Sequence, residues 1–178
     1  MIIPALLLFA MSAEEAMRVV VLSAFQLTAA QAHGKPAILS ETRQPESEYV
    51  EAMDGELPDA ALRAEMVKPH APVSLRSVFK VNGQQLTTPQ EIESLISDGT
   101  PEERVARFRK RFPFGVLQFS AVGTMPHNRD AFVTYEWLTA RIDKHGDFQL
   151  RPAEIDLIEL APQAMGWRII AQHSVGIE

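Results

Sequence analysis

The feature that most constrains this chain is a change in hydrophobic periodicity at Phe114. Residues 88–112 carry the spacing and start signals of helices, whereas the apolar residues after Phe114 alternate with polar ones, as in half-buried strands. The strand-like stretches are residues 115–122, 130–141, 148–160 and 167–175. Residues 143–147 have the composition of a hairpin loop. Consecutive strands joined by short turns predict an antiparallel β-meander in the C-terminal half.

Two helix starts with the same pattern precede this sheet. Thr88-Pro89 and Thr100-Pro101 each place a capping threonine before a proline, with a glutamate at the third helical position. We therefore expect helices to begin at Pro89 and Pro101. Helices followed by a run of strands are typical of the α+β class. The expected fold is a single α+β domain, with N-terminal helices packed on one face of a C-terminal antiparallel β-meander sheet.

Length, charge and missing motifs narrow the class of protein. The chain has 178 residues, which suits one domain, and a formal net charge of −6, which argues against nucleic acid as a partner. The absence of cysteine excludes disulfides, thiolate metal sites and cysteine nucleophiles. The sequence also lacks a glycine-rich phosphate loop, a G-x-S-x-G elbow and an H-E-x-x-H helix. We therefore expect no metal site and no cofactor.

The N-terminal segment has three interpretations, two of which involve export. Residues 1–10, MIIPALLLFA, are too short to span a bilayer, which takes about 20 residues, but they suit the apolar region of a signal peptide. Small residues follow at Ser12 and Ala13. In the second interpretation Arg18 precedes an apolar region at residues 19–30, and Ala30-Gln31-Ala32 is the cleavage site.

The third interpretation makes part of this segment a structural helix. Ser12 and Glu15 have the spacing of a capping box, and apolar residues then recur on one helical face. This face consists of Met17, Val20, Val21 and Ala24. We favour export to the periplasm or the medium, with a signal peptide at residues 1–13 and a domain at 14–178 that has no transmembrane segment. A cytoplasmic protein that buries residues 1–9 is the alternative.

One histidine differs from the others. His33, His70, His127 and His145 fall in predicted turns and are expected to be solvated. Strict alternation along the last strand places His173 on an apolar face, with Trp167, Ile169, Ala171 and Val175. Tyr135 and Trp137 share a face of their own strand. Tyr135, Trp137, Glu159 and His173 are therefore the candidate ligand-binding residues, and a hydrogen-bonded core histidine is the structural alternative.

Two groups of charged residues complete the candidates. Glu154 and Asp156 share one face of their strand and are expected to face solvent, whereas Glu159 lies on the other face. Arg104, Arg107 and Arg111 have the i, i+3, i+7 spacing of one helical face. That face suits phosphate, acidic lipid or an acidic partner. A solvated face is the alternative, because acidic residues at the helix start and basic ones at its end match the helix dipole.

A series of short motifs runs along most of the chain. They are Ile38–Thr42, Pro72 with Leu75, Phe108–Pro113 followed by Gly115, Phe119–Gly123, Ala131–Tyr135 and Trp167–Ile169. In this order they resemble a family of uncharacterised bacterial proteins, many of which are exported. Many members carry Cys-Gly pairs after the segment that matches Ala131–Tyr135, and this chain has none, so no chemistry at that place carries over. The resemblance implies no activity.

The last four predicted strands resemble a second fold. The final strand, with Trp167-Arg168-Ile169, is similar to the end of the nuclear-transport-factor-like cone fold, which is shared with ketosteroid isomerase and polyketide cyclases. In that fold the final strand closes a curved sheet around a pocket. This resemblance is an analogy of fold, and a shared fold does not fix a function.

Two hypotheses of function follow from these residues. The first is a non-enzymatic exported domain that binds a small-molecule ligand or an envelope protein partner, because no catalytic motif is present. The second is a cone-type binding protein or acid/base enzyme that uses a pocket around His173 and a carboxylate. A deep cavity that holds both groups favours the second hypothesis, and a filled core favours the first.

Overall fold

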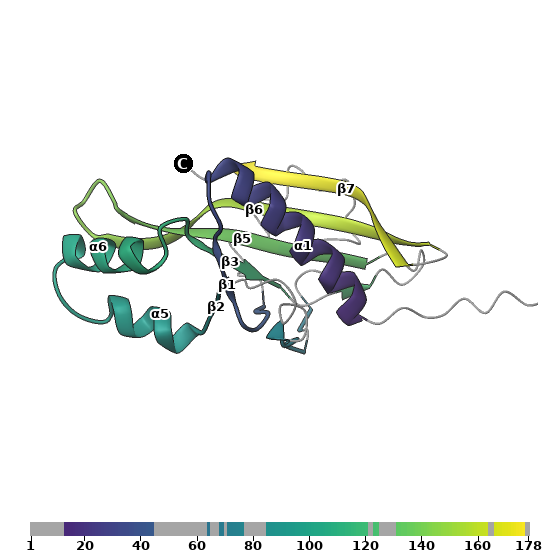
Figure 1. Ribbon diagram of the computed structural model, residues 1–178, viewed down its shortest axis with the longest axis horizontal. Helices are drawn as coiled ribbons and strands as arrows, with labels where there is room; N and C mark the ends of the chain where they lie inside the picture. Colours follow the sequence, from purple (N-terminus) through teal and green to yellow (C-terminus); the bar gives the residue numbers. More distant parts are fainter. Residues whose placement is uncertain are drawn as a thin grey trace, which may run out of the picture.

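The computed structural model describes residues 13–44, 64, 68–69, 71–76, 85–120, 123–124, 131–163 and 166–176 (Figure 1). The elements are α1 (Ala13–Gln31), β1 (Ala37–Leu39), β2 (Leu86–Thr87), α5 (Pro89–Ile96), α6 (Pro101–Arg111), β3 (Val116–Phe119), β4 (Gly123–Thr124), β5 (Ala131–Ile142), β6 (Phe148–Gln163) and β7 (Gly166–Gly176). None of these helices is long and apolar enough to cross a membrane.

One seven-stranded sheet forms the centre of the described part. Its order is β2-β1-β3-β5-β6-β7, with β4 also paired to β5. All pairs among β3 to β7 are antiparallel, which confirms the α+β class and the meander predicted after Phe114. The short strand β1 pairs in parallel with β2 and β3, so the sheet as a whole is mixed.

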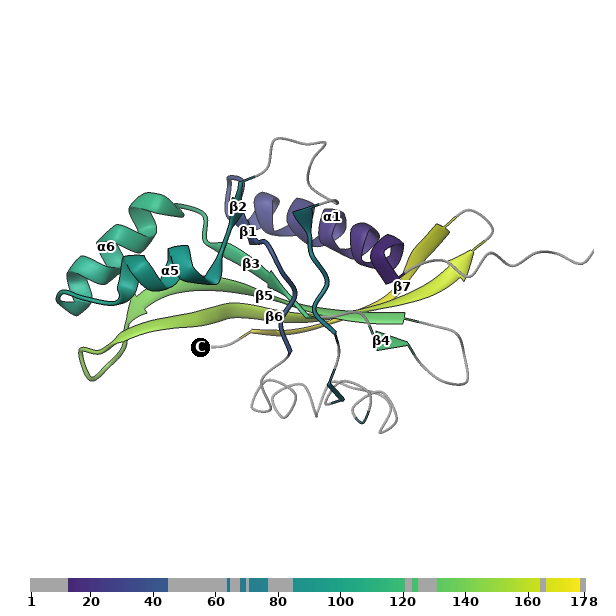
Figure 2. The same ribbon diagram turned by 90° about the horizontal axis from the view of Figure 1, so that it is seen from below.

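The helix α1 covers one face of this sheet (Figure 2). Its predicted apolar face is confirmed: Met17, Val20, Val21 and Ala24 are fully buried. They join one core cluster with strand residues that include Leu117, Phe119, Val133, Tyr135, Ile158 and Leu160. Each Å² of apolar surface buried between α1 and the sheet contributes about 25 cal/mol of stability. This burial holds α1 in place.

The helices α5 and α6 begin where the two Thr-Pro pairs predicted. The Thr88 hydroxyl accepts a hydrogen bond from the backbone N–H of Glu91, and Thr100 and Glu103 form a complete capping box. Figure 1 shows both helices together near the β5–β6 hairpin. Such a cap stabilises a helix by about 1 kcal/mol. Local sequence therefore fixes both helix starts without help from the sheet.

The helices do not all contact the same set of strand side chains. The cluster around α5 and α6 takes Val116 of β3 and Leu138 of β5. The α1 cluster takes the adjacent residues Leu117 and Trp137, which point to the other face because successive side chains of a strand alternate. α1 thus covers one face of the sheet, and α5 and α6 contact the opposite face at one end.

Two bulges interrupt the pairing of the longest strands. Trp137 pairs with Glu154, but Leu138 pairs with Pro152, which leaves Ala153 as an extra residue of β6. Bulges of this kind bend a strand and increase its twist. The second bulge lies between β6 and β7, and it changes the candidate site.

Candidate functional site

The second bulge overturns the predicted alternation of β7. Leu160 pairs with Ile169, but Glu159 pairs with Ala171, so Ile170 is an extra residue. Before the bulge, Trp167 belongs to the core cluster under α1. After it, His173 pairs with Leu157, whose neighbour Ile158 points to that cluster, so His173 points to the opposite face. The expectation that Trp167, Ile169 and His173 share a face is therefore wrong.

The predicted ligand-binding residues consequently divide into two pairs on opposite faces. Tyr135 and Trp137 do share a face, as expected, and both lie in or against the α1 cluster. Glu159 and His173 lie together on the other face, where the Glu159 carboxylate is 2.9 Å from Nε2 of His173. The structure brings together each pair but not all four residues.

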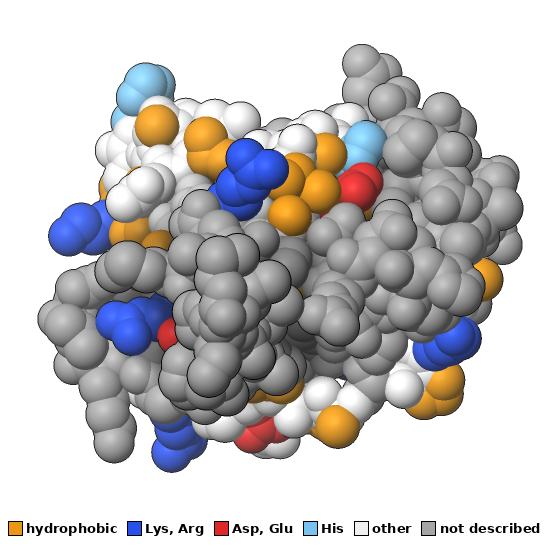
Figure 3. Space-filling view, turned by 90° about the vertical axis from the view of Figure 1, so that its right-hand side faces the viewer, with side chains coloured by type: hydrophobic (Ala, Val, Ile, Leu, Met, Phe, Trp, Pro, Cys, Tyr) orange, Lys and Arg blue, Asp and Glu red, His pale blue; other side chains and the backbone are white. Residues whose placement is uncertain are grey.

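The His173–Glu159 pair is partly buried. The side chain of His173 is 19% exposed and that of Glu159 is 24% exposed. On the side of the molecule drawn in Figure 3, a histidine side chain and an acidic one are visible beside a group of hydrophobic side chains. A histidine that contacts a carboxylate has the geometry for proton transfer. The same contact is also a hydrogen bond that two partly buried polar groups need for structural reasons alone.

The expectation that Asp156 faces solvent is wrong. Asp156 is fully buried, because it pairs with Tyr135 and points to the side that α1 covers. Its Oδ1 accepts hydrogen bonds from Nε2 of Gln172 at 3.1 Å and from the hydroxyl of Ser174. Among the described residues its Oδ2 has no hydrogen-bond partner. Glu154 lies on the same strand, and its side chain is outside the described residues.

Two of the three predicted anion-binding arginines join α6 to α5. Arg107 donates to the carbonyl of Leu95 at 2.8 Å and to the carboxylate of Asp98 at 3.0 Å. Arg111 forms an ion pair with Glu91 at 2.6 Å. Arg104 makes one long hydrogen bond of 3.4 Å to the Asp98 carbonyl. These contacts give the arginine face of α6 a structural role. The binding of an anion to this face stays a prediction.

The remaining histidines add no site to the described part. His33 and His145 are exposed, in keeping with the expected turns. His70 and His127 lie outside the described residues. Across the described residues no three His, Cys, Asp or Glu side chains come together to hold a metal ion.

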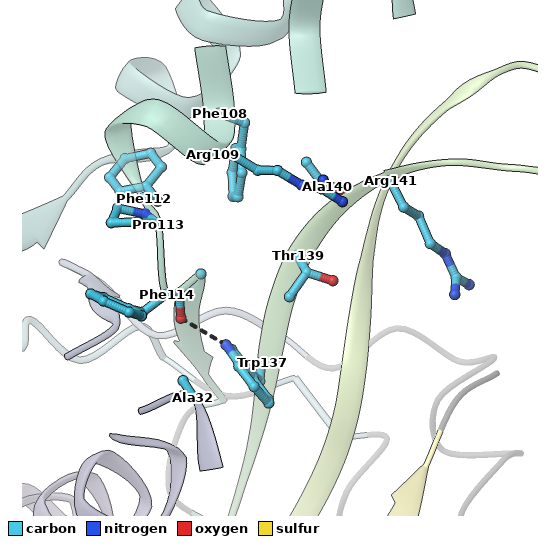
Figure 4. Close-up of a pocket in the computed structure, with 11 residues that line it drawn as sticks. Ala32, Phe108, Arg109, Phe112, Pro113, Phe114, Trp137, Thr139, Ala140 and Arg141 are labelled. Atoms are coloured by element: carbon cyan, nitrogen blue, oxygen red, sulfur yellow. Dashed lines mark hydrogen bonds between the residues drawn. The ribbon is translucent and has the colours of Figure 1, made fainter. Parts of the chain in front are cut away.

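A different place has the shape of a binding site. A groove of about 620 Å³ lies beside α6, the loop before β3 and the end of β5 (Figure 4). The residues that line it are Ala32, Phe108, Arg109, Phe112, Pro113, Phe114, Gly115, Trp137, Thr139, Ala140 and Arg141. The rings of Phe108 and Phe112 meet edge to face, with centroids 5.2 Å apart. We call this feature the aromatic groove.

Two close approaches of the backbone fix the walls of the aromatic groove. The indole N–H of Trp137 donates to the carbonyl of Phe114 at 3.0 Å, as Figure 4 shows. Gly115 has a φ of +77°, and a Cβ there would lie 2.5 Å from the indole nitrogen of Trp137. A Cβ on Gly34 would lie 2.3 Å from the ring of Phe114. Only glycine permits both rings to sit where they do.

The charge of the aromatic groove comes from arginine alone. Arg109 reaches from α6 to the carbonyl of Ala140, with its Nε at 3.3 Å and its Nη2 at 3.1 Å (Figure 4). Arg141 also lines the groove and extends away from its centre. No acidic side chain is among the lining residues, and neither arginine has a carboxylate partner in the described part of the chain.

The alternation along residues 130–141 indicates Trp137, but no pattern in the sequence indicates its partners in this groove. Arg109 is off the i, i+3, i+7 row of arginines, and nothing in the sequence showed that the row would be paired with α5. The available signal was Phe112-Pro113-Phe114-Gly115, a cluster of aromatic residues with a proline and a glycine at the end of a helix. Such a segment leaves rings beside a turn, where they can line a cavity.

Comparisons with known proteins return no relative. No protein-family model matches this chain, no curated protein matches it, and no solved structure is significantly similar to it. The resemblances to the exported bacterial family and to the cone fold stay predictions.

Proposed function

We propose that this protein is a non-enzymatic binding domain whose aromatic groove takes a ligand with an aromatic or apolar body and a carboxylate. One observation carries the proposal: the exposed ring of Phe114, the half-buried ring of Trp137 and two guanidinium groups line one groove without an acidic side chain, and the buried rings of Phe108 and Phe112 lie in its wall. Ligand sites are concave, mostly apolar, and contain a few polar groups that fix orientation. The aromatic groove has these properties.

The chemistry of the walls supports this class of ligand. A flat apolar ligand gains area against the rings of Phe114 and Trp137, and offset or edge contacts between rings add about 0.5–1.5 kcal/mol. Arg109 presents a planar fork that matches a carboxylate, and two of its nitrogens already lie on the groove side at Ala140. Because the chain carries a net charge of −6, it repels anions overall. The positive charge of the groove offsets this repulsion locally and favours an anionic ligand there.

The test is a binding titration with 1-naphthoate as probe, followed by calorimetry. We expect wild-type protein to bind it, and Arg109→Gln to weaken binding about tenfold or more, since a charge-assisted hydrogen bond contributes about 1.5–3 kcal/mol. Lys110→Gln is the matched control, because Lys110 is exposed on the same helix and does not line the groove. Neutral 1-naphthalenemethanol should bind Arg109→Gln and wild type equally. If Arg109→Gln and Lys110→Gln lose the same amount of affinity for 1-naphthoate, or if wild-type protein does not bind 1-naphthoate, the proposal is wrong.

A second candidate function is acid/base chemistry at the His173–Glu159 pair. The 2.9 Å contact between a partly buried histidine and a carboxylate favours it. NMR titration of the His173 imidazole, with and without a set of apolar carbonyl compounds, separates the two functions. We expect no ligand-dependent shift, and His173→Asn should leave binding in the aromatic groove unchanged. A clear ligand-induced shift at His173 places the acid/base function first.

Export is part of the proposed function. The apolar residues 1–10 and the small residues after them support it. The packing of α1 supports cleavage near residue 13 rather than after Ala32, since removal of residues 14–32 would take away the fully buried Val20 and Val21. N-terminal sequencing of the protein from its native host tests this. A start at His33, or an intact Met1 in the cytosol, contradicts the expected cleavage.

A further inference from the structure

The strand β5 extends beyond its neighbour at the aromatic groove. The pairing of β3 with β5 begins at Val116 opposite Leu138, whereas β5 continues to Ile142. In the described part of the chain no strand lies beside residues 139–142 on that side. This free segment of edge is the rim of the aromatic groove, because Thr139, Ala140 and Arg141 line it.

The backbone groups of this free edge point toward the groove. In an antiparallel strand the N–H and C=O of one residue point to the same side, and the side alternates along the chain. The carbonyl of Thr134 accepts from the N–H of Ser120 at 2.8 Å, so Thr134 points to the β3 side. Ala140 and Ile142 have the same parity. The contact of Arg109 with the Ala140 carbonyl confirms this direction for Ala140.

We propose that the ligand of the aromatic groove is an extended peptide that adds as a strand to β5 at Ala140 and Ile142, with its C-terminal carboxylate on Arg109. This inference rests on the proposed function and names its ligand class. Strand addition takes affinity from main-chain hydrogen bonds and specificity from pockets for alternate side chains. The free edge supplies the hydrogen bonds, and the aromatic rings supply the pocket.

Ala140 is only 2% exposed and its carbonyl already accepts from Arg109, so a peptide reaches this edge only by displacing the guanidinium. A free edge is prone to unwanted pairing, and a charged side chain over it is one way in which proteins protect it. An incoming peptide N–H replaces Arg109 at the Ala140 carbonyl, so no acceptor is left unsatisfied. The released guanidinium then forms a bidentate pair with the peptide carboxylate, which is the stronger contact of the two.

The position of Arg109 also fixes the direction of the peptide. A peptide antiparallel to β5 runs from the hairpin side toward Gly115, in line with β3. Its C-terminus then lies near Ala140, where Arg109 reaches the edge. A parallel peptide would carry its carboxylate toward Ile142 and the hairpin, away from Arg109. The antiparallel direction is therefore the one that joins both parts of the site.

The probe is the tetrapeptide acetyl-Thr-Val-Thr-Phe with a free C-terminus, compared with its C-terminal amide and with two singly N-methylated forms. We expect the free acid to bind about tenfold tighter than the amide, because the amide cannot make the charge-assisted pair. N-methylation at alternate positions should weaken binding strongly in one form and little in the other, since only alternate N–H groups face β5. Hydrogen exchange at Ala140 and Ile142 should slow when the peptide binds.

The variants separate this inference from the proposed function. Arg109→Gln should remove the preference for the free acid over the amide, and Lys110→Gln should keep it. If 1-naphthoate binds in the groove but both N-methylated peptides bind like the parent, strand addition is wrong and the proposed function stands. If neither naphthoate nor peptide binds, both fail. If Arg109→Gln instead associates with itself while wild type ignores the peptide, Arg109 only protects the edge and the inference is overturned.

Discussion

The face of the sheet under α1 and the end of the sheet beside α6 are covered in different ways. Under α1 the side chains of Met17, Val20 and Val21 are fully buried, and they interlock with a continuous cluster of strand residues. Beside α6 the rings of Phe108 and Phe112 are buried, but Phe114 is 36% exposed and Ile142 at the end of β5 is 39% exposed. The first region resembles an ordinary core, and the second keeps exposed aromatic surface next to uncompensated positive charge.

Stability and ligand binding therefore depend on different regions of the molecule. Large apolar side chains contribute most where neighbours fill all the space around them. A ring that lines a groove loses part of this contribution and gains a surface available to a ligand. Substitutions in the two regions should therefore separate stability from binding.

The largest effect is expected at Met17, in the filled region. Met17→Ala leaves a cavity in a fully buried place and should lower the free energy of unfolding by about 2–5 kcal/mol. The matched variant Phe114→Ala, in the aromatic groove, should cost less than about 1 kcal/mol of stability but weaken ligand binding. Urea unfolding of both variants measures the difference. A larger loss of stability for Phe114→Ala than for Met17→Ala would contradict this difference between the two regions.

A smaller effect is expected at the glycine that shapes the groove. Gly115→Ala should destabilise the protein by about 1–3 kcal/mol, since Gly115 combines a φ of +77° with a Cβ position 2.7 Å from the Leu138 carbonyl. Gly146 is the control, because its φ is +86° but nothing lies within 4 Å of the Cβ position. Thermal unfolding of both alanine variants isolates the contribution of the close approach. Equal losses would mean that only the backbone conformation matters.

The smallest effect concerns the hairpin loop between β5 and β6. Hydrogen bonds from the backbone N–H groups of Asp147 and His145 lower the pKa of Asp143 below its ordinary value. The contribution of this carboxylate to the loop is therefore present above the ordinary pKa and is lost as the pH falls through the lowered one. The amide proton shifts of Asp147 and His145 should titrate with that lowered midpoint, and Asp143→Asn should abolish the titration. A midpoint at or above the ordinary value contradicts this.

The parts of the fold that sequence predicted depend on local signals. The Thr-Pro starts place α5 and α6 because a cap needs only residues within one turn. The alternation after Phe114 predicts strands because it reflects burial of one face along each strand. The face of α1 that carries Met17 and Val20 follows from helical spacing in the same way.

The parts that sequence missed depend on contacts between distant segments. The bulge at Ile170 arises from the pairing of β7 with β6, and it moves His173 to the other face without any mark in the local pattern. Asp156 is buried because α1 covers its face of the sheet. The residues next to Asp156 in the sequence give no sign of this cover. Arg107 and Arg111 form ion pairs with Asp98 and Glu91, whereas Arg109 reaches the distant strand β5, and the spacing of the arginines along α6 does not show this difference.

We propose that the aromatic groove, and not the His173–Glu159 pair, binds the ligand. A chemical-shift map of the isotopically labelled protein, recorded as 1-naphthoate is added, tests it most directly. We predict that the largest changes occur at the indole N–H of Trp137 and at the amides of Gly115 and Ala140, with His173 unchanged. Changes centred on His173 and Glu159, or no change at Trp137 and Ala140, would contradict the account.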